Sequence, residues 1–317
     1  MSPKSPVYRR IAVVGTGLIG SSWAAFFLAR GFDVVASDPA PGAEEKLRAF
    51  VDRCWPTLTQ LGVTEDSSRK RLSFASSAAA AVAGADFVQE SGPERLELKH
   101  RLYAEMDEAA RADAILASST SGLTMSAIQT ACRKPERCVV GHPFNPPHVM
   151  PLVEIVGGKV TSPETIDRAD TFYSSLGKHT IRLNREVPGH VANRLQAALW
   201  REAVHLVSEG VVTVADVDAA VTAGPGLRWA IMGPNLIFHL GGGPGGMAHF
   251  MEHLSGPFTS WWEDLGEPRL TPELKQILID GAKAEAGGQM IETLARRRDE
   301  ALVGILKILS SSNHTRV

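Results

Sequence analysis

The sequence has few cysteines, no long hydrophobic run and no excess of charge of one sign. Its three cysteines, Cys54, Cys132 and Cys138, show no CxxC spacing. This predicts neither a disulfide framework nor a metal site. The 33 Lys and Arg nearly balance the 35 Asp and Glu, which argues against a nucleic-acid or anionic-membrane binder. No run of 18 or more apolar residues occurs, which argues against a membrane-spanning helix.

The basic N-terminus is followed by only four apolar residues, IAVV, before Gly15. This run is too short for the core of a signal peptide. Together with the few cysteines, it predicts a soluble, cytoplasmic protein. The length of 317 residues suggests about two domains at roughly 150 residues each.

Short apolar runs alternate with helical patterns through the first half of the chain. Residues 10–14 form a β-branched run that stops at glycines, which is typical of a buried parallel strand. The same alternation continues, with further strands expected at 32–36, 86–89, 114–117, 138–141, 152–156 and 179–183, and helices at 21–30, 43–61 and 163–176. It predicts an α/β Rossmann-type domain over residues 1–187, with helices on both faces of a parallel sheet.

From residue 188 onward the strand signals stop. Helical patterns cover residues 190–209, 214–223 and 271–309, with a glycine-rich interruption at 241–246. We therefore expect an all-α domain over 188–317, with the last residues, 310–317, frayed.

The motif Gly15-Thr16-Gly17-Leu18-Ile19-Gly20 directly follows the first predicted strand and opens a helix. In this context GxGxxG predicts a dinucleotide-binding loop. The first glycine permits the tight turn, the second lets a pyrophosphate approach the backbone, and the third allows close helix-to-strand packing.

Asp38 follows Gly20 by 18 residues, at the end of the second predicted strand. A carboxylate there can accept from both ribose hydroxyls, and residues 39–43 contain no Arg or Lys to pair with a 2′-phosphate. The sequence therefore predicts NAD rather than NADP. The alternative, a glycine turn with an N-capping Asp, explains the combined position and context less well.

His142 and Glu154 are the candidates for proton transfer. Oxidation of a secondary alcohol needs a base for the hydroxyl proton, and histidine suits this role near neutral pH. Glu154 lies within the apolar segment LVEIV, where an unpaired charge is costly, so it needs a partner that His142 could supply. Taken alone, a histidine beside prolines is as consistent with a structural role.

Ser121 and Asn193 are polar residues that could donate to a substrate oxygen. Spacing alone does not separate this role from helix capping.

Several motifs recur together in an order that resembles the 3-hydroxyacyl-CoA dehydrogenase superfamily across nearly the whole chain: GTGLIG, ASDP, VQESGPERLELK, SSTSGL, GHPFNPP, LVEIV and PGHVANRL. The sequence is most similar to the branch acting on small free hydroxy acids, which contains carnitine 3-dehydrogenases and L-gulonate 3-dehydrogenases (lambda-crystallins). The stretches DPAPGAEEKLRA, WREAVHLVSEG and GPGLRWAIMGP favour the carnitine group.

The resemblance implies site roles and a homodimer formed mainly by the helical domain. It assigns His142 as acid and base and Glu154 as the carboxylate that orients it. Ser121 and Asn193 would bind the reacting oxygen. On the cofactor side, the implied residues are Glu90 and Lys99 at the nicotinamide end, with Ser119 also touching cofactor.

The segment after Asp38 bears on the substrate. In the CoA-using enzymes a longer, lysine-rich helical pair holds the CoA nucleotide there. Residues 44–72 of this chain carry six basic and five acidic residues, so no site for the CoA 3′-phosphate is evident. A free acid is the better prediction. Arg228 is a candidate for binding its carboxylate, the alternative being an ordinary salt bridge.

Aromatic side chains of the helical half could form a cage for a trimethylammonium group, although packing or a dimer interface would equally explain them; they are Trp200, Trp229, Phe238, Trp261 and Trp262. A sugar acid would instead use polar partners such as Asn235, His239 and His253. We predict NAD-dependent oxidation of the 3-hydroxyl of a small 3-hydroxy acid, with an L-carnitine-like substrate favoured and Arg228 and Trp229 contributing to its site. The alternatives are an L-gulonate or 3-hydroxybutyrate dehydrogenase, a 3-hydroxyacyl-CoA dehydrogenase, and a crystallin-like NAD-binding structural protein.

Overall fold

The computed structural model describes residues 8–311, and the chain divides into two compact units. The first unit ends at Arg194 and the second begins at Leu195. The first is a Rossmann-type α/β domain and the second is helical, which confirms the predicted fold class. The division lies a few residues beyond the boundary predicted at 187/188.

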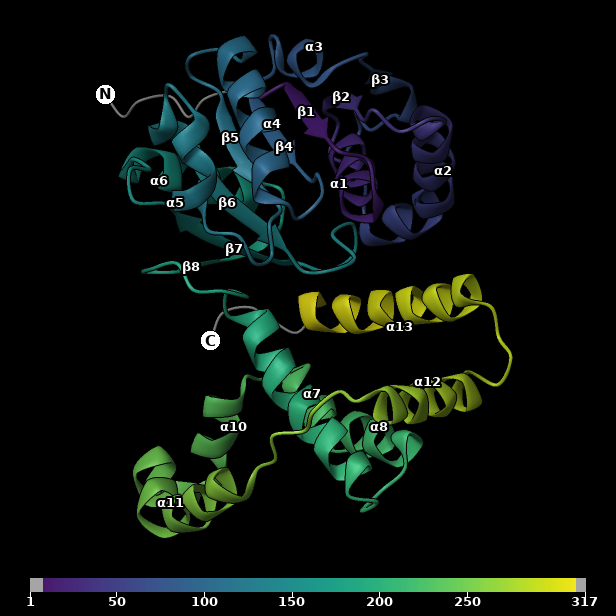
Figure 1. Cartoon of the computed structure of the whole chain (residues 1–317), viewed down its shortest axis with the longest axis vertical. Coiled ribbons are helices and arrows are strands. Elements are labelled where there is room, and N and C mark those ends of the chain that lie inside the picture. The colour runs from purple at the N-terminus through teal and green to yellow at the C-terminus, as the bar shows by residue number, and fades with distance from the viewer. Residues whose placement is uncertain (1–7, 312–317) are drawn as a thin grey trace. The chain divides into compact units, whose positions relative to one another are not determined.

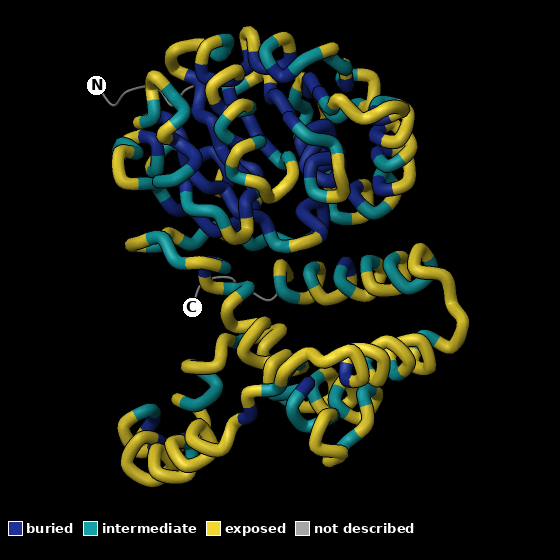
Figure 2. Tube along the Cα trace, in the orientation of Figure 1, coloured by how far each residue is buried: buried dark blue, intermediate teal, exposed yellow. Residues whose placement is uncertain are grey.

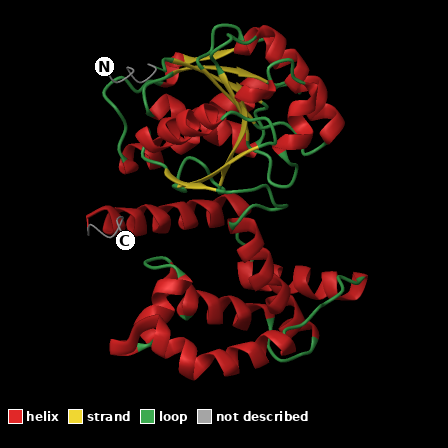
Figure 3. Ribbon diagram, turned by 90° about the vertical axis from the view of Figure 1, so that its left-hand side faces the viewer, coloured by secondary structure: helices red, strands yellow, loops and turns green. Residues whose placement is uncertain are grey.

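The first unit is built on an eight-stranded sheet with the order β3-β2-β1-β4-β5-β6-β7-β8 (Figure 3). All neighbouring strands are parallel except β6 and β7, which pair antiparallel, whereas the sequence predicted a parallel sheet. The eight-residue connection between them, 144–151, is too short for the crossover that a parallel pair requires. The strands are β1 (Arg10–Val14), β2 (Asp33–Ser37), β3 (Leu72–Phe74), β4 (Phe87–Glu90), β5 (Ile115–Ser118), β6 (Cys138–Pro143), β7 (Leu152–Gly157) and β8 (His179–Arg182).

Helices cover both faces of this sheet (Figure 1). Side chains alternate along β1, so Ile11 and Val13 enter one core cluster while Ala12 and Val14 enter the other. The first cluster includes Trp23 of α1, and the second includes Tyr103 of α4. The helices of this unit are α1 (Leu18–Ala29), α2 (Ala43–Leu61), α3 (Ala78–Val82), α4 (Leu96–Ala109), α5 (Met125–Ile128) and α6 (Pro163–Ser175), with short 3₁₀ helices at Arg69–Arg71, Gln129–Ala131 and Pro135–Arg137.

The second unit contains only helices over residues 195–311. Figure 2 shows that most of its chain is exposed, in contrast to the buried interior of the first unit. Large apolar side chains are among the exposed ones, with Trp262 at 67% and Ile291 at 75%. Its helices are α7 (Ala192–Ser208), which begins in the first unit, α8 (Val214–Ala223), α9 (Pro225–Trp229), α10 (Pro234–Gly241), α11 (Gly246–Asp264), α12 (Pro272–Ala286) and α13 (Ile291–Ser311), with a 3₁₀ turn at Gly243–Gly245.

The predicted single helix over 271–309 is wrong. It is two helices, α12 and α13, because Gly287 and Gly288 adopt positive φ angles of 59° and 72° between them. Strand β3 was not predicted. The expectation of a frayed end at 310–317 lies outside the described residues, except that Ser310 and Ser311 are helical. None of the helices within residues 8–311 has the length and hydropathy needed to cross a membrane.

Candidate active site

The loop between β1 and α1 is shaped by its three glycines. Gly15 has φ of +89°, and a Cβ there would lie 2.7 Å from the carbonyl carbon of Ser91. A Cβ at Gly20 would lie 1.8 Å from the Gly15 oxygen. In contrast, a Cβ at Gly17 would meet no atom within 4 Å. The chain itself leaves open space over Gly17, and this space fits the pyrophosphate of a dinucleotide.

The two apolar residues of this loop lie at the start of α1. Leu18 is exposed, whereas Ile19 is half-buried and packs against the first core cluster. Asp38 follows β2 and reaches the same loop. Its Oδ2 accepts a hydrogen bond from Thr16 N at 2.7 Å, and its Oδ1 accepts from Ala40 N at 2.9 Å. The carboxylate therefore lies beside the glycine loop, the position expected for binding ribose.

His142 on β6 and Glu154 on β7 are in direct contact and both are buried. His142 Nδ1 lies 2.8 Å from Glu154 Oε2. Since an ionised carboxylate can only accept, Nδ1 carries the proton, and Nε2 of the neutral ring is an acceptor. The Ser121 hydroxyl donates to this Nε2 at 3.0 Å. The structure thus brings together three of the four predicted catalytic residues.

Glu154 is fully buried, and the N-terminal end of α7 supplies two further donors to it. Its Oε1 accepts from the backbone N–H groups of Val191 at 2.8 Å and Ala192 at 3.0 Å. Burial acts to raise the pKa of this carboxyl, but the hydrogen bonds from His142, Ala192 and Val191 outweigh burial and hold the pKa below its ordinary value. Glu154 therefore stays ionised near neutral pH and can stabilise a positive charge that forms on His142 when the ring accepts a proton.

Asn193 lies in the first turn of α7, directly after Ala192, and is half-buried. It belongs to the first unit, like the His142–Glu154 pair. Its position in the sequence, next to one of the residues that hold Glu154, places it close to the pair.

His190 is a second buried histidine, which the sequence analysis did not identify. Its ring centroid lies 4.8 Å from that of His142, and its Nε2 donates to the Thr120 carbonyl at 2.9 Å. Burial lowers its pKa, an effect that neighbouring His142 reinforces and the Thr120 hydrogen bond opposes. His190 is therefore neutral, and it fixes the backbone directly before Ser121. Its φ of +49° is rare for a residue other than glycine.

Glu94 organises the loop that carries Ser121 and was also not identified, although it lies within the quoted motif VQESGPERLELK. Its Oε1 accepts from the Thr120 hydroxyl at 2.6 Å and from three successive N–H groups, those of Ser121, Gly122 and Leu123. Partial burial acts to raise the pKa of Glu94, but these hydrogen bonds lower it overall. The charge of Glu94 thus holds the turn from which Ser121 reaches His142.

Glu90 and Lys99 form a buried ion pair at the end of β4. Lys99 Nζ lies 2.8 Å and 2.9 Å from the two carboxylate oxygens, which also accept from Gly92 N and the Ser118 hydroxyl. The pair therefore supports the backbone around Ser91, which the glycine loop contacts. Ser119 lies in the same region, with its Oγ 2.8 Å from Gln89 Nε2 and 2.9 Å from Ser91 Oγ.

The predicted substrate-binding residues Arg228 and Trp229 lie on α9 of the second unit, and both are exposed. Within this unit, Phe258 contacts the rings of Phe238, Trp261 and Trp262, three of the predicted cage residues, with centroids 5.1, 4.9 and 6.5 Å away. These aromatic side chains therefore pack on one another.

Comparisons with known proteins identify the family of the chain. The models of two 3-hydroxyacyl-CoA dehydrogenase domains match this chain. The model of the NAD binding domain matches residues 10–187, and the model of the C-terminal domain matches residues 189–273. An L-carnitine dehydrogenase of Streptomyces griseus is 52% identical over 299 residues, covering 94% of this chain and 89% of the relative. One from Bacillus cereus is 47% identical over 301 residues, covering 95% and 92%. The crystal structure of an FHMPC 5-dehydrogenase, an NAD⁺-dependent dismutase, has a TM-score of 0.82 at 31% identity, covering 96% of this chain and 99% of that one.

Proposed function

The chain belongs to the 3-hydroxyacyl-CoA dehydrogenase family, and on this premise we propose that it oxidises the 3-hydroxyl group of L-carnitine to the ketone. It is an NAD-dependent oxidoreductase that acts on a 3-hydroxy acid. The observation that carries the proposed mechanism is the buried contact between His142 and Glu154, with Ser121 on the other ring nitrogen.

The proposed base is Nε2 of His142. Its lone pair is directed to the Ser121 hydroxyl in this structure, and a substrate hydroxyl bound beside Ser121 would share that position. As the base takes the hydroxyl proton, the ring becomes an imidazolium whose Nδ1–H still donates to Glu154. A carboxylate that remains ionised stabilises this charged ring, so Glu154 lowers the energy of the proton transfer. Asn193 is proposed to hold the same substrate oxygen.

The glycine loop and Asp38 are the proposed cofactor site. Gly15, Gly17 and Gly20, with Leu18 and Ile19 between them, would hold the pyrophosphate at the start of α1, and Asp38 would accept from the ribose hydroxyls. When bound, NAD supplies the two-electron acceptor for the hydrogen on the carbinol carbon. Glu90, Lys99 and Ser119 are proposed to support the nicotinamide end through the backbone they fix.

Carnitine carries a carboxylate and a quaternary ammonium group, and the second unit has side chains suited to each. A guanidinium such as that of Arg228 binds a carboxylate with two parallel hydrogen bonds. An aromatic face such as that of Trp229 attracts a quaternary ammonium. We assign these two residues to substrate binding, because the relatives that match almost the whole chain act on carnitine by name.

The direct test is NADH formation followed at 340 nm with NAD and, in turn, L-carnitine, L-gulonate, L-3-hydroxybutyrate and 3-hydroxybutyryl-CoA. Turnover of carnitine at least tenfold above the other three is expected. A higher kcat/KM for gulonate, hydroxybutyrate or the CoA thioester would reject the carnitine assignment. Tight NAD binding without turnover of any of the four would favour the crystallin-like role.

We also propose that the protein is a cytoplasmic homodimer. The large apolar side chains exposed on the second unit, among them Trp262, Met290 and Ile291, support a partner surface there. Light scattering is expected to give twice the mass of one chain. The Cys138 thiol donates a hydrogen bond to Cys132 Sγ at 3.6 Å and both cysteines are free thiols, which supports a reducing compartment.

A further inference from the structure

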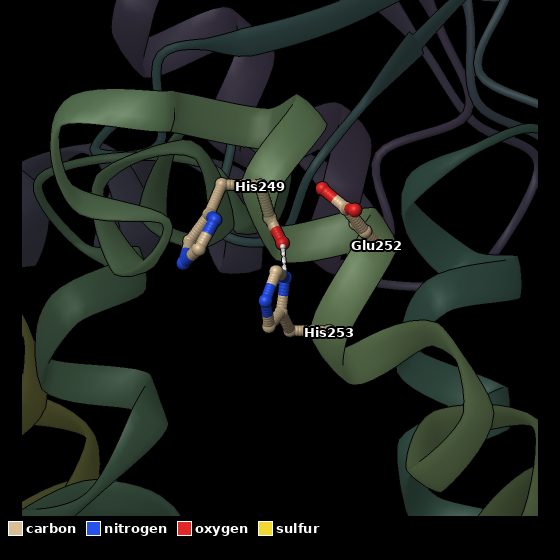
Figure 4. Close-up of side chains that lie close together, drawn as sticks. All are labelled: His249, Glu252 and His253. Carbon is tan, nitrogen blue, oxygen red and sulfur yellow. Dashed lines mark hydrogen bonds between the residues drawn. The ribbon is translucent and has the colours of Figure 1, made fainter.

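Helix α11 of the second unit carries a group of exposed side chains that proton and hydride transfer do not involve. His249, Glu252 and His253 each offer a ligand atom, and these atoms all lie within 4.8 Å of one another. Figure 4 shows the three side chains close together on the helix. The group is formed within one helix and lies outside the site described above.

The spacing of the three residues places them on one face of the helix. Residues at i, i+3 and i+4 are neighbours on an α-helical surface, and two histidines at i and i+4 can share one metal ion. The ring centroids of His249 and His253 are already 4.1 Å apart. Rotation about exposed side-chain bonds is sufficient to bring their nitrogens to one ion.

A hydrogen bond of His253 leaves its Nε2 available to bind a metal ion. Its Nδ1 donates to the backbone carbonyl of His249 at 3.1 Å. This bond fixes the tautomer in which Nε2 carries the lone pair. Histidines that bind metals in proteins nearly always donate their other ring N–H in this way, to a carbonyl or a carboxylate.

This face of α11 is polar, whereas the opposite face is apolar. At 100° per residue, Gly256, Ser260 and Glu263 continue the face of the three ligands, and the apolar residues Phe250, Leu254, Phe258, Trp261 and Trp262 point the other way. A partner that covers the apolar face would therefore leave the three ligands accessible to solvent.

Two features of the sequence lower the stability of α11 near the three ligands. It begins directly after the glycine-rich segment, with Gly246 at a φ of +59°, and it contains Pro257. Proline has no N–H, so the carbonyl of His253, four residues earlier, lacks its usual helical partner. An ion held by His249 and His253 would link two turns next to this break and stabilise them.

We propose that His249, Glu252 and His253 form a binding site for a divalent transition-metal ion of the Zn²⁺, Ni²⁺ and Cu²⁺ class. Two imidazoles and one carboxylate suit these ions, and water completes the coordination. The site revises the prediction of no metal site, which considered only the cysteines. It is independent of the proposed substrate.

The first test is calorimetric titration of tag-free, chelator-treated full-length protein with NiCl₂, repeated with ZnCl₂. We expect one site per chain, and His253→Gln or His249→Gln should weaken it at least about tenfold, equivalent to ~1.4 kcal/mol. Glu252→Gln should weaken it less than either. His179→Gln, which changes an exposed histidine on β8, is the matched control and should bind normally. Equal affinity in the wild type and in His253→Gln would overturn the proposal, as would loss of the site in Cys132→Ser.

A second readout follows the helix itself. Hydrogen exchange of the amides in residues 250–256 should slow when NiCl₂ is added to the wild type and stay unchanged in His253→Gln. Because all three ligands are exposed, these variants are expected to fold. If metal slowed exchange equally in both proteins, the ion would be bound elsewhere and the assignment would be wrong.

Discussion

His142 and Glu154 are directly opposite each other in the antiparallel pairing of β6 and β7. Opposite residues of such a pair point to the same face of the sheet with their Cβ atoms about 5 Å apart. The strand pairing therefore positions the carboxylate against Nδ1 of the ring without help from a flexible loop.

Glu154→Gln should lower kcat by about 10²–10⁴-fold and leave the Kd for NAD nearly unchanged. The amide oxygen can still accept from Val191 and Ala192, but its NH₂ group then faces Nδ1 of His142. The ring is forced into the tautomer that has no lone pair at Nε2, and the imidazolium loses its counter-charge. Stopped-flow turnover and calorimetric titration with NAD measure the two effects. A matching loss of cofactor affinity would contradict the assigned role.

Ser121→Ala and His190→Asn should have effects on kcat that do not add. His190 holds the Thr120 carbonyl, and Ser121 is the next residue, so both side chains act through the same contact with His142. Asparagine tolerates the left-handed backbone at position 190, which keeps strain out of the comparison. In a double-mutant cycle the coupling should exceed about 0.5 kcal/mol. Additive effects would mean that His190 does not position Ser121.

Gly17→Ala should lower the affinity for NAD, whereas Gly20→Ala should lower the stability of the fold. A Cβ at Gly17 enters open space and its φ is −62°, so the melting temperature should hold while NAD affinity falls at least about tenfold. A Cβ at Gly20 would collide with the Gly15 oxygen, so this variant should lose stability. Thermal melts and NAD titration separate the two. Normal NAD affinity in Gly17→Ala would place the pyrophosphate elsewhere.

Lys178 should make stability depend on pH. It is buried, its Nζ donates to the carbonyls of Pro147 and Met150, and burial, with a smaller effect from Arg30, lowers its pKa to about 7. In the unfolded chain a lysine has a pKa of about 10.4. Between about pH 7 and pH 10.4, Lys178 is therefore protonated in the unfolded chain and neutral in the folded chain. Stability from this group therefore rises with pH across that window, by up to ~1.4 kcal/mol per unit.

Lys178→Met removes the titrating group, so the difference in unfolding free energy between wild type and variant should change with pH between about 7 and 10. Urea unfolding at pH 7, 8 and 9 measures it. A constant difference over these three values would show that Lys178 keeps its charge throughout.

Arg228→Ala should raise the KM for L-carnitine at least about tenfold, because a charged hydrogen bond to the carboxylate contributes roughly 1.5–3 kcal/mol. The KM for NAD should not change. Arg296→Ala, which alters an exposed arginine on α13, is the control. An unchanged KM for carnitine in Arg228→Ala would remove Arg228 from the substrate site.

Features with strong local signals were predictable from the sequence. The helices Ala43–Leu61 and Val214–Ala223 begin and end where glycines and a capping Thr indicate. Glu154, a charge within an apolar strand, indicated its need for a partner. Strand β3 has only three residues, Leu72-Ser73-Phe74, which is too short for an alternating pattern to predict a strand. The role of His190 depends on its contact with His142 in space. The two residues are 48 positions apart in the sequence, so no local sequence pattern could predict this contact.

The two donors that Val191 and Ala192 give to Glu154 also bear on the modularity of this family. A chain cut at residue 187, where the match to the first domain ends, would leave a buried carboxylate with one of its three donors. Because these two donors are backbone N–H groups, a segment from a relative that folds into the same helix start would supply them whatever its side chains, whereas truncation before Val191 would remove them. The proposed proton-transfer site therefore needs residues beyond 187, where the match to the NAD binding domain ends, although these residues still belong to the first unit.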